Sequence, residues 1–230
     1  MAGLKDDFCT IVVCLEGCHG SGKTKLCEEF AARGFEVLDE AFLQMPEYAL
    51  HPQSLVMETY WVAHWFQRLL KRHFELHRDS RKNASGPKYR ILIADRSPYS
   101  AVFYSRRRGD LLEGVIQAQI EELRDNANIH IITVHVCVPR DVLWNRILHR
   151  LEREPERRKY REDSAEWLEE TLRFYDNFHW DYSVTNDKDT IAEVMNGMVR
   201  KLDRLLQEER SLFPQEDPHW SMAMISPTRT

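Results

Sequence analysis

The sequence predicts an α/β protein, a three-layer sandwich in which a mostly parallel, five-stranded sheet lies between layers of helices. Two observations support this prediction. Apolar, β-branched runs alternate along the 230-residue chain with segments of helical periodicity, as in a parallel sheet wrapped by helices. The first apolar run also leads into a glycine-rich loop that opens a helix. We expect a single domain over residues 1–210 and a loosely ordered tail over residues 211–230, which contain three prolines.

The glycine-rich loop runs from Gly17 to Thr24 and fits the phosphate-binding pattern G-x-x-x-x-G-K-[ST] at every fixed position. A strand is predicted over residues 10–15 before it and a helix over residues 25–33 after it, so an accidental glycine turn is a poor explanation. Backbone N–H groups of such a loop and of the helix N-terminus cradle phosphate oxygens. The Lys23 ammonium should reach the β- and γ-phosphates, and the Thr24 hydroxyl should hold Mg²⁺. The residues predicted to bind ATP here are Gly17, Gly20, Ser21, Gly22, Lys23 and Thr24.

The remaining elements follow from hydrophobic periodicity and from the placement of glycine and proline. Strands are predicted over residues 35–38, 89–94, 128–138 and 181–185. Helices are predicted over residues 53–78, 98–104, 110–125, 139–151, 164–179 and 190–209. The segments 41–52 and 79–88 contain prolines or a Gly-Pro pair and are predicted to be loops.

The composition and charge of the sequence limit the kinds of partner and the cellular location that we expect. The formal net charge of −5 argues against a general nucleic-acid or membrane-binding surface, so we expect neither partner. No apolar run approaches membrane-spanning length, and the first residues lack the apolar core of a signal peptide. The five cysteines form no C-x-x-C pair, which is typical of reduced thiols. These features together predict a cytoplasmic location.

Charged residues follow two predicted strands, at the edge where ligands bind in parallel sheets. Glu40 ends the second strand and could orient a hydroxyl nucleophile and accept its proton, although a solvated or helix-capping acid is the alternative. Asp95 ends the third strand and is a candidate ligand of Mg²⁺. Arg96 next to it offers a planar fork for a phosphate or a substrate oxygen, unless the two form a surface salt bridge.

A segment dense in both charges, residues 149–162, follows the predicted helix over 139–151. Arg146 and Arg150 are four residues apart and therefore share one helix face. We expect them to bind phosphate as part of an arginine-rich lid that closes over the transferring group. The alternative is a solvated helix whose arginines pair with Glu152, Glu154 and Glu156.

Three motifs resemble the deoxynucleoside kinase and thymidylate kinase superfamily of P-loop kinases. They are Leu15-Glu16-Gly17 before the loop, Asp95-Arg96-Ser97 followed by Tyr99-Ser100, and Arg146-x-x-x-Arg150 before the charged lid. The resemblance covers about residues 10–209.

The resemblance implies an ATP- and Mg²⁺-dependent kinase that acts on a small acceptor and is often a homodimer. It implies Glu40 as the base, Asp95 as the Mg²⁺-linked acid and Arg96 near the 5′-oxygen. The predicted catalytic residues are Lys23, Glu40, Arg96 and Arg150, and Thr24 and Asp95 are the predicted metal ligands.

The acceptor site is predicted to contain Glu40, Glu58, Tyr60 and Arg96. Glu58 falls where nucleoside kinases usually carry a glutamine that reads the base edge, and an ionised carboxylate there only accepts hydrogen bonds. Nearby aromatics at Tyr60, Trp61 and Trp65 could wall a base pocket, although ordinary core packing is the more frequent role of such a stripe.

Phosphoryl transfer to a (deoxy)nucleoside 5′-hydroxyl is therefore the first expectation, and a thymidylate-type monophosphate kinase is the alternative. The thymidylate branch usually has an aromatic residue where this chain has Ser97, and the long helix reads Ala63-His64-Trp65-Phe66 instead of an Asn-Arg-Trp-Glu-like stretch. A non-catalytic or regulatory nucleotide-binding protein is a further alternative.

Two other classes of protein contain the same phosphate-binding loop. A signalling GTPase needs D-x-x-G and N-K-x-D motifs, and residues 186–189 read Asn-Asp-Lys-Asp. An AAA-type motor has an acidic strand end that Val37–Glu40 imitates. Here that strand end comes only about fifteen residues after Thr24, which is early for that class, and the chain is short.

Overall fold

The computed structural model describes residues 8–41, 50–82, 89–105, 108–186, 192–197 and 200. Within these residues a single sheet has the strand order β2-β3-β1-β4-β5, and every neighbouring pair is parallel. The predicted α/β class and five-stranded sheet are confirmed, and the sheet is fully rather than mostly parallel. The strands are β1 (Cys9–Glu16), β2 (Glu36–Leu38), β3 (Tyr89–Asp95), β4 (Ile129–Cys137) and β5 (Tyr182–Thr185).

Helices connect the strands in the predicted order. They are α1 (Lys23–Ala32), α2 (Leu55–Lys82), α3 (Ser100–Tyr104), α4 (Asp110–Ala127), α5 (Arg140–Arg153), the 3₁₀ helix η2 (Pro155–Tyr160) and α6 (Ala165–Asn177). Ser164 caps α6, because its side chain accepts a hydrogen bond from the backbone N–H of Trp167. Residues 192–197 are also helical, within the helix predicted over 190–209.

Most element boundaries differ from the predicted ones by one or two residues, and two of the differences have a clear local cause. The loop predicted over 79–88 begins later, because α2 continues to Lys82. The polar end of α2 has an i,i+4 hydrogen bond from Arg81 to His77. In the sequence, no glycine or proline interrupts this helix before Gly86. Helix α3 begins at Ser100 rather than at residue 98, because Pro98 and Tyr99 form a turn. Residues 42–49 and 83–88 of the predicted loops and the predicted tail, 211–230, lie outside the described residues.

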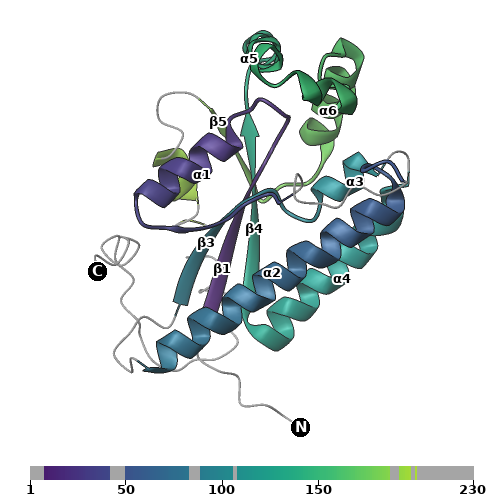
Figure 1. Cartoon of the computed structure of the whole chain (residues 1–230). Helices are drawn as coiled ribbons and strands as arrows, with labels where there is room; N and C mark the ends of the chain where they lie inside the picture. Colours follow the sequence, from purple (N-terminus) through teal and green to yellow (C-terminus); the bar gives the residue numbers. More distant parts are fainter. Residues whose placement is uncertain are drawn as a thin grey trace.

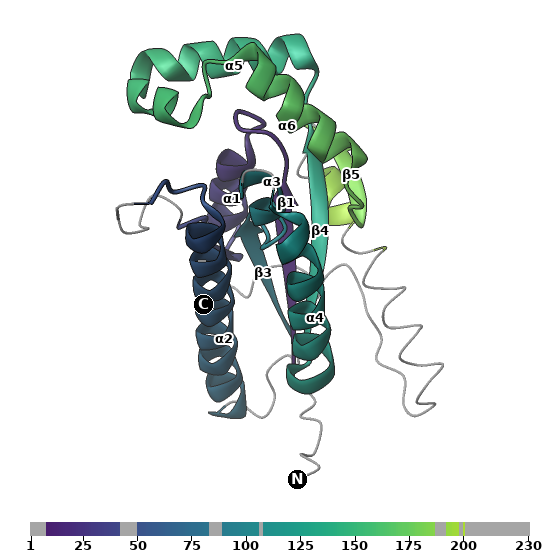
Figure 2. The same ribbon diagram turned by 90° about the vertical axis from the view of Figure 1, so that its right-hand side faces the viewer.

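The sheet separates two apolar layers, because alternate strand residues point to opposite faces. On one face Val12, Leu92 and Ile129 pack against α2 and α4 through Trp65 and Ile116. On the other face Val13, Ile93 and Val136 pack against Phe30 of α1. Figures 1 and 2 show the resulting three layers, with α2 and α4 side by side on one face of the sheet and α1 on the other.

Helices α5 and α6 form a smaller unit that lies across the carboxyl ends of the strands, above the glycine-rich loop (Figure 2). Leu143, Ile147 and Leu168 form its core together with Cys18 of the loop and Tyr175 of α6. The lid predicted over residues 149–162 therefore corresponds to the end of α5, to η2 and to the turn after it. The α5–α6 unit therefore covers the edge of the sheet where the predicted site residues lie.

In the described part of the chain, no helix combines the length and apolarity needed to cross a membrane. All five cysteines lie in described segments, and no disulfide joins them.

Candidate functional site

A cavity of about 420 Å³ opens at the carboxyl edge of the sheet, between the glycine-rich loop, the first turn of α2 and the α5–η2 segment. Its size is that of a small-molecule site. Most of the predicted site residues line it. The lining residues are His19, Gly20, Gly22, Lys23, Thr24, Lys25, Glu40, Gln53, Glu58, Trp61, Asp95, Arg96, Ser100, Tyr104, Arg146, Arg150, Arg153, Glu154, Arg157, Tyr160 and Glu162.

The loop backbone has the conformation that its glycines allow. Gly17 has φ 145°, and a Cβ atom added there would lie 2.7 Å from the carbonyl oxygen of Val136 in β4. Gly22 has φ 94° and precedes the first residue of α1. The side chain of Asn186, after β5, donates to the carbonyl of Ser21. The loop is thus fixed by a strand on one side and by a side chain on the other.

Lys23 folds back over the loop that precedes it. Its Nζ atom donates to the carbonyl oxygens of Gly17 at 2.7 Å and Cys18 at 2.9 Å, and to Ser21 Oγ at 3.3 Å. Burial, together with the nearby Arg96 guanidinium, lowers the pKa of Lys23 to about 8. The ammonium therefore lies inside the loop cradle, where phosphate oxygens would bind.

Thr24 and Asp95 contact each other in the way expected of a metal site. The Thr24 hydroxyl donates to Asp95 Oδ2 at 2.6 Å, while Asp95 Oδ1 is buried and has no hydrogen-bond partner among the described residues. Burial raises the pKa of the Asp95 carboxyl, and Lys23 opposes this. A hydroxyl and a carboxylate with an unused oxygen are suitable ligands for Mg²⁺, which prefers hard oxygen donors.

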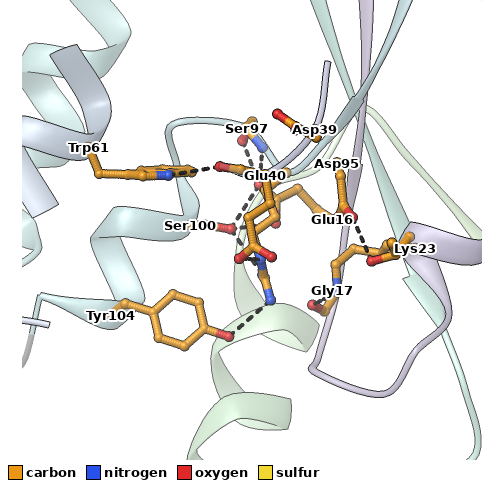
Figure 3. A network of polar contacts seen from close by, with 12 residues as sticks. Glu16, Gly17, Lys23, Asp39, Glu40, Trp61, Asp95, Ser97, Ser100 and Tyr104 are labelled. Atoms are coloured by element: carbon orange, nitrogen blue, oxygen red, sulfur yellow. Dashed lines mark hydrogen bonds and ion pairs between the residues drawn. The ribbon is translucent and has the colours of Figure 1, made fainter. Parts of the chain in front are cut away.

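Arg96 is the centre of a buried hydrogen-bond network. Figure 3 shows three of its partners, Glu40, Ser100 and Tyr104. Its backbone has φ 75°, in the left-handed region. Its Nε atom donates to Glu40 Oε1 at 2.6 Å, and its Nη1 atom donates to Tyr175 at 2.8 Å and to Ser100 at 3.2 Å. The Nη2 atom donates to the Tyr104 hydroxyl at 3.3 Å. All three guanidinium nitrogens are therefore engaged, and the side chain is held rigidly.

Glu16 belongs to this network but was absent from the predicted site residues. It is fully buried at the end of β1 and accepts from the Ser97 backbone N–H at 2.6 Å and from the Ser97 hydroxyl at 2.7 Å. It also accepts from Ser100 at 2.8 Å and from Tyr175 at 3.3 Å. The available signal was a glutamate at the end of an apolar strand, immediately before the loop, since such a residue is rarely left buried without partners.

The first turns of α2 contribute Glu58 and Trp61 to the cavity. Glu58 is 2 % exposed, and its Oε1 atom has no hydrogen-bond partner in the described part of the chain. Burial raises the pKa of Glu58 well above its ordinary value. The Trp61 indole donates to the backbone oxygen of Glu40 at 3.1 Å, and Trp65 is buried and donates to that of Arg96 at 3.2 Å. Tyr60 is 47 % exposed and does not line the cavity.

The lid arginines both line the cavity and form ion pairs within the lid. Arg146, Arg150, Arg153 and Arg157 line it. Arg150 Nε donates to Glu154 Oε1 at 3.2 Å, and Arg157 pairs with Glu154 and also with Glu162, at 3.2 Å. The two interpretations offered by the sequence, a helix with i,i+4 pairs and a lid facing a ligand, are therefore compatible.

His19 is a second residue that the sequence prediction missed. It is 5 % exposed in the wall of the cavity, and its Nε2 atom has no hydrogen-bond partner within the described ranges. Burial, together with the nearby charges of Lys23, Arg96 and two lid arginines, lowers the pKa of His19 to about 3, so the ring is neutral at physiological pH.

Comparison with known proteins gives one sequence match and several similar structures. A family model described as an AAA domain matches residues 13–169, from β1 into α6. Two structures of a deoxyadenosine kinase from M. mycoides, one with products dCMP and a flexible dCDP bound and one with dCTP bound, are similar. Their identities are 16 % and 14 % and their TM-scores 0.44 and 0.43, over 84 % of this chain and 99 % of theirs.

A thymidylate kinase from Ehrlichia chaffeensis is similar at 16 % identity and a TM-score of 0.41, over 84 % of this chain and 99 % of that one. No curated protein sequence matches the chain.

Proposed function

We propose that this chain, which belongs to the AAA domain family, transfers the γ-phosphoryl group of ATP to the 5′-hydroxyl of a (deoxy)nucleoside. One observation carries the proposal. A single cavity is lined on one side by the phosphate-binding loop with the Thr24–Asp95 pair, and on another by the Glu40–Arg96 ion pair. A carboxylate facing a phosphate-binding loop across a cavity is the arrangement needed for transfer to a hydroxyl.

In this proposal each residue acts on an identifiable atom. The loop N–H groups and Lys23 bind the β- and γ-phosphates. Glu40, with one carboxylate oxygen held by Arg96, orients the acceptor hydroxyl and accepts its proton. The hydroxyl oxygen attacks the γ-phosphorus, and the bond from that phosphorus to the oxygen of the β-phosphate breaks, which releases ADP. Arg150 and its neighbours in the lid neutralise charge on the transferring group. Thr24 and Asp95 would hold Mg²⁺, which would offset the negative charge of the phosphates.

The family description favours one other function, that of an ATP-driven motor. In such a motor the acidic residues at the end of the strand would be Asp39–Glu40, but here these residues follow β2, which is an outermost strand of the sheet. The strand adjacent to β1 is β3, and the acid at its end, Asp95, is the one bonded to Thr24. Glu40 is instead bonded to Arg96 on the acceptor side of the cavity. This arrangement supports transfer to a bound acceptor over acceptor-independent hydrolysis.

The test is a panel of nucleosides and nucleoside monophosphates, each incubated with ATP and Mg²⁺ and assayed for ADP release and for the phosphorylated acceptor. Stimulation by a nucleoside is expected. Stimulation by monophosphates alone would assign the thymidylate-type alternative. Fast acceptor-independent hydrolysis would favour the motor, and nucleotide binding without turnover would indicate a regulatory protein. Lys23→Ala is the control, since it removes phosphate binding whichever acceptor is right.

A further inference from the structure

Glu58 is a buried acid that lines the cavity, and one of its oxygens has no hydrogen-bond partner in the described ranges of the chain. It lies in the first turn of α2, three residues before Trp61 and on the same helix face. Its side chain lines the cavity and its Oε1 atom is unpartnered among the described residues. A buried polar group in this position requires a hydrogen-bond partner that the described part of the chain does not supply, and a ligand in the cavity can provide it.

The charged groups around Glu58 act on its protonation in opposite directions, because Arg96 favours the ionised form and Glu40 the neutral form. The nearby cation, Arg96 at the end of β3, already donates to Glu40, Ser100, Tyr104 and Tyr175. Glu40, at the end of β2, adds a second negative charge near Glu58. Burial of the Tyr104 hydroxyl on α3 raises its pKa, so that group stays neutral.

Burial and the Glu40 carboxylate raise the pKa of Glu58, and the attraction of Arg96 only partly opposes them. Burial at this position therefore favours the protonated form of the Glu58 carboxyl group.

A protonated carboxyl group changes what the site can bind. The ionised form only accepts hydrogen bonds, whereas the neutral form presents one O–H donor beside one carbonyl acceptor. That is the hydrogen-bonding capacity of a side-chain amide. The expectation that a glutamate at this position can only accept hydrogen bonds is therefore replaced by one in which it both donates and accepts.

We propose that Glu58 binds the acceptor as a neutral carboxylic acid, donating to a ring or exocyclic acceptor atom of a nucleobase and accepting from the neighbouring N–H. The ligand class is a base with one donor adjacent to one acceptor, such as the N3–H and O4 of thymine or the N3 and N4–H₂ of cytosine. An edge with two adjacent donors, such as guanine N1–H and N2–H₂, suits the ionised form instead. This inference rests on the proposed function for the identity of the ligand.

The kinetic test compares Glu58→Gln with Glu58→Leu on the best acceptor of the panel. Glu58→Gln keeps the donor–acceptor pair, so kcat/KM is expected to stay within about threefold of wild type at neutral pH. Glu58→Leu removes both groups and should lower kcat/KM by about 10- to 100-fold, mostly through KM. At high pH the wild type should lose more activity than Glu58→Gln, because the loss through Lys23 is common to both and only the wild type also ionises Glu58. A Glu58→Gln loss as large as that of Glu58→Leu would overturn the inference.

Infrared difference spectroscopy tests the protonation without any acceptor. The free protein at neutral pH should show the C=O stretching band of a protonated carboxyl, and Glu58→Gln should lack it. A pH titration of the wild-type band gives the same readout if the variant does not fold. Absence of the band overturns the inference even where the kinase assay succeeds. A band without any active acceptor keeps the protonation but refutes both the proposed function and base binding by Glu58.

Discussion

The Nε atom of Arg96 lies 2.6 Å from Oε1 of Glu40, and this ion pair joins the ends of β3 and β2. Arg96 is 7 % exposed at its side chain, whereas Glu40 is 37 % exposed and opens into the cavity. One end of the pair is therefore fixed by packing and the other is available to a ligand. A rigid cation that orients a carboxylate toward a cavity is a suitable support for a catalytic base.

Glu40→Gln should lower kcat by about 10²-fold with little change in the nucleotide KM, because the amide keeps the shape of the side chain but cannot accept the hydroxyl proton. Steady-state kinetics with the preferred acceptor measure this. Asp39→Asn is the matched control, since Asp39 is the adjacent acid, is exposed and pairs with Arg68. A Glu40→Gln enzyme with near-wild-type kcat would reassign the base.

Thr24→Val should raise the Mg²⁺ concentration needed for half-maximal turnover by about 10-fold or more. Valine matches the shape of threonine but removes the hydroxyl that contacts Asp95 at 2.6 Å. A Mg²⁺ titration at saturating ATP measures the shift. Thr59→Val is the control, because that hydroxyl is exposed and donates to the backbone of its own helix. An unchanged Mg²⁺ midpoint in Thr24→Val would remove Thr24 from the metal site.

Glu16→Ala should lower the free energy of unfolding by about 3 kcal/mol, because it leaves the Ser97 N–H and the hydroxyls of Ser100 and Tyr175 without their buried acceptor. Urea denaturation followed by circular dichroism measures this. Glu28→Ala, on the exposed face of α1, should change stability by less than about 0.5 kcal/mol. Equal stabilities of the two variants would mean that the Glu16 network contributes nothing.

The convergence of Glu40, Asp95 and Arg96 was predictable from the sequence. Each acid follows an apolar run, and parallel strands end at the same edge of a sheet. The observed register agrees, since Leu15 is level with Asp95 and Leu38 with Ala94. The topology of the sheet alone therefore brings these residues together.

The burial of individual side chains, and the side of each helix that faces the cavity, were not predictable in the same way. Glu58 and Tyr60 are two residues apart on α2, which places them about 200° apart around the helix axis, so only one can face the cavity. Tyr175 reaches Glu16 across 159 residues of sequence, and no local pattern predicts such a contact. The protonation of Glu58 depends on its depth, which only the packed structure defines.

Two glycine substitutions should have opposite effects on stability. Gly17→Ala places a Cβ atom 2.7 Å from the Val136 carbonyl at φ 145°, so it should destabilise the fold by more than about 1 kcal/mol and abolish nucleotide binding. Gly114→Ala, in the middle of α4 with nothing within 4 Å of the added atom, should stabilise by about 0.5–1 kcal/mol. Thermal unfolding with and without nucleotide compares them; a Gly17→Ala protein that binds nucleotide normally would contradict the close approach.

Raising the pH through about 8 should change nucleotide affinity and folding stability in opposite directions, and both effects originate at Lys23. The pKa of Lys23 falls from 10.5 to about 8 on folding, because burial disfavours the ammonium and Arg96 repels it. Above pH 8 the free site loses the proton that phosphate binding requires. The dissociation constant for nucleotide should therefore rise by up to about tenfold per pH unit, which isothermal titration calorimetry can measure.

The folding stability should increase over the same pH range in which the nucleotide affinity falls. The reason is that the unfolded chain keeps the Lys23 proton up to about pH 10.5, while the folded chain releases it near pH 8. Between these values the unfolded state binds more protons, so the unfolding free energy gains up to about 3 kcal/mol from this residue as pH rises. Other groups titrate in the same range, so the measurement is the difference between wild type and Lys23→Met. Lys71→Met, at an exposed position of α2, should leave both pH profiles unchanged. A wild-type affinity that stays constant from pH 7 to 9.5 would show that Lys23 keeps its proton and that the loop holds the ammonium more strongly than burial opposes it.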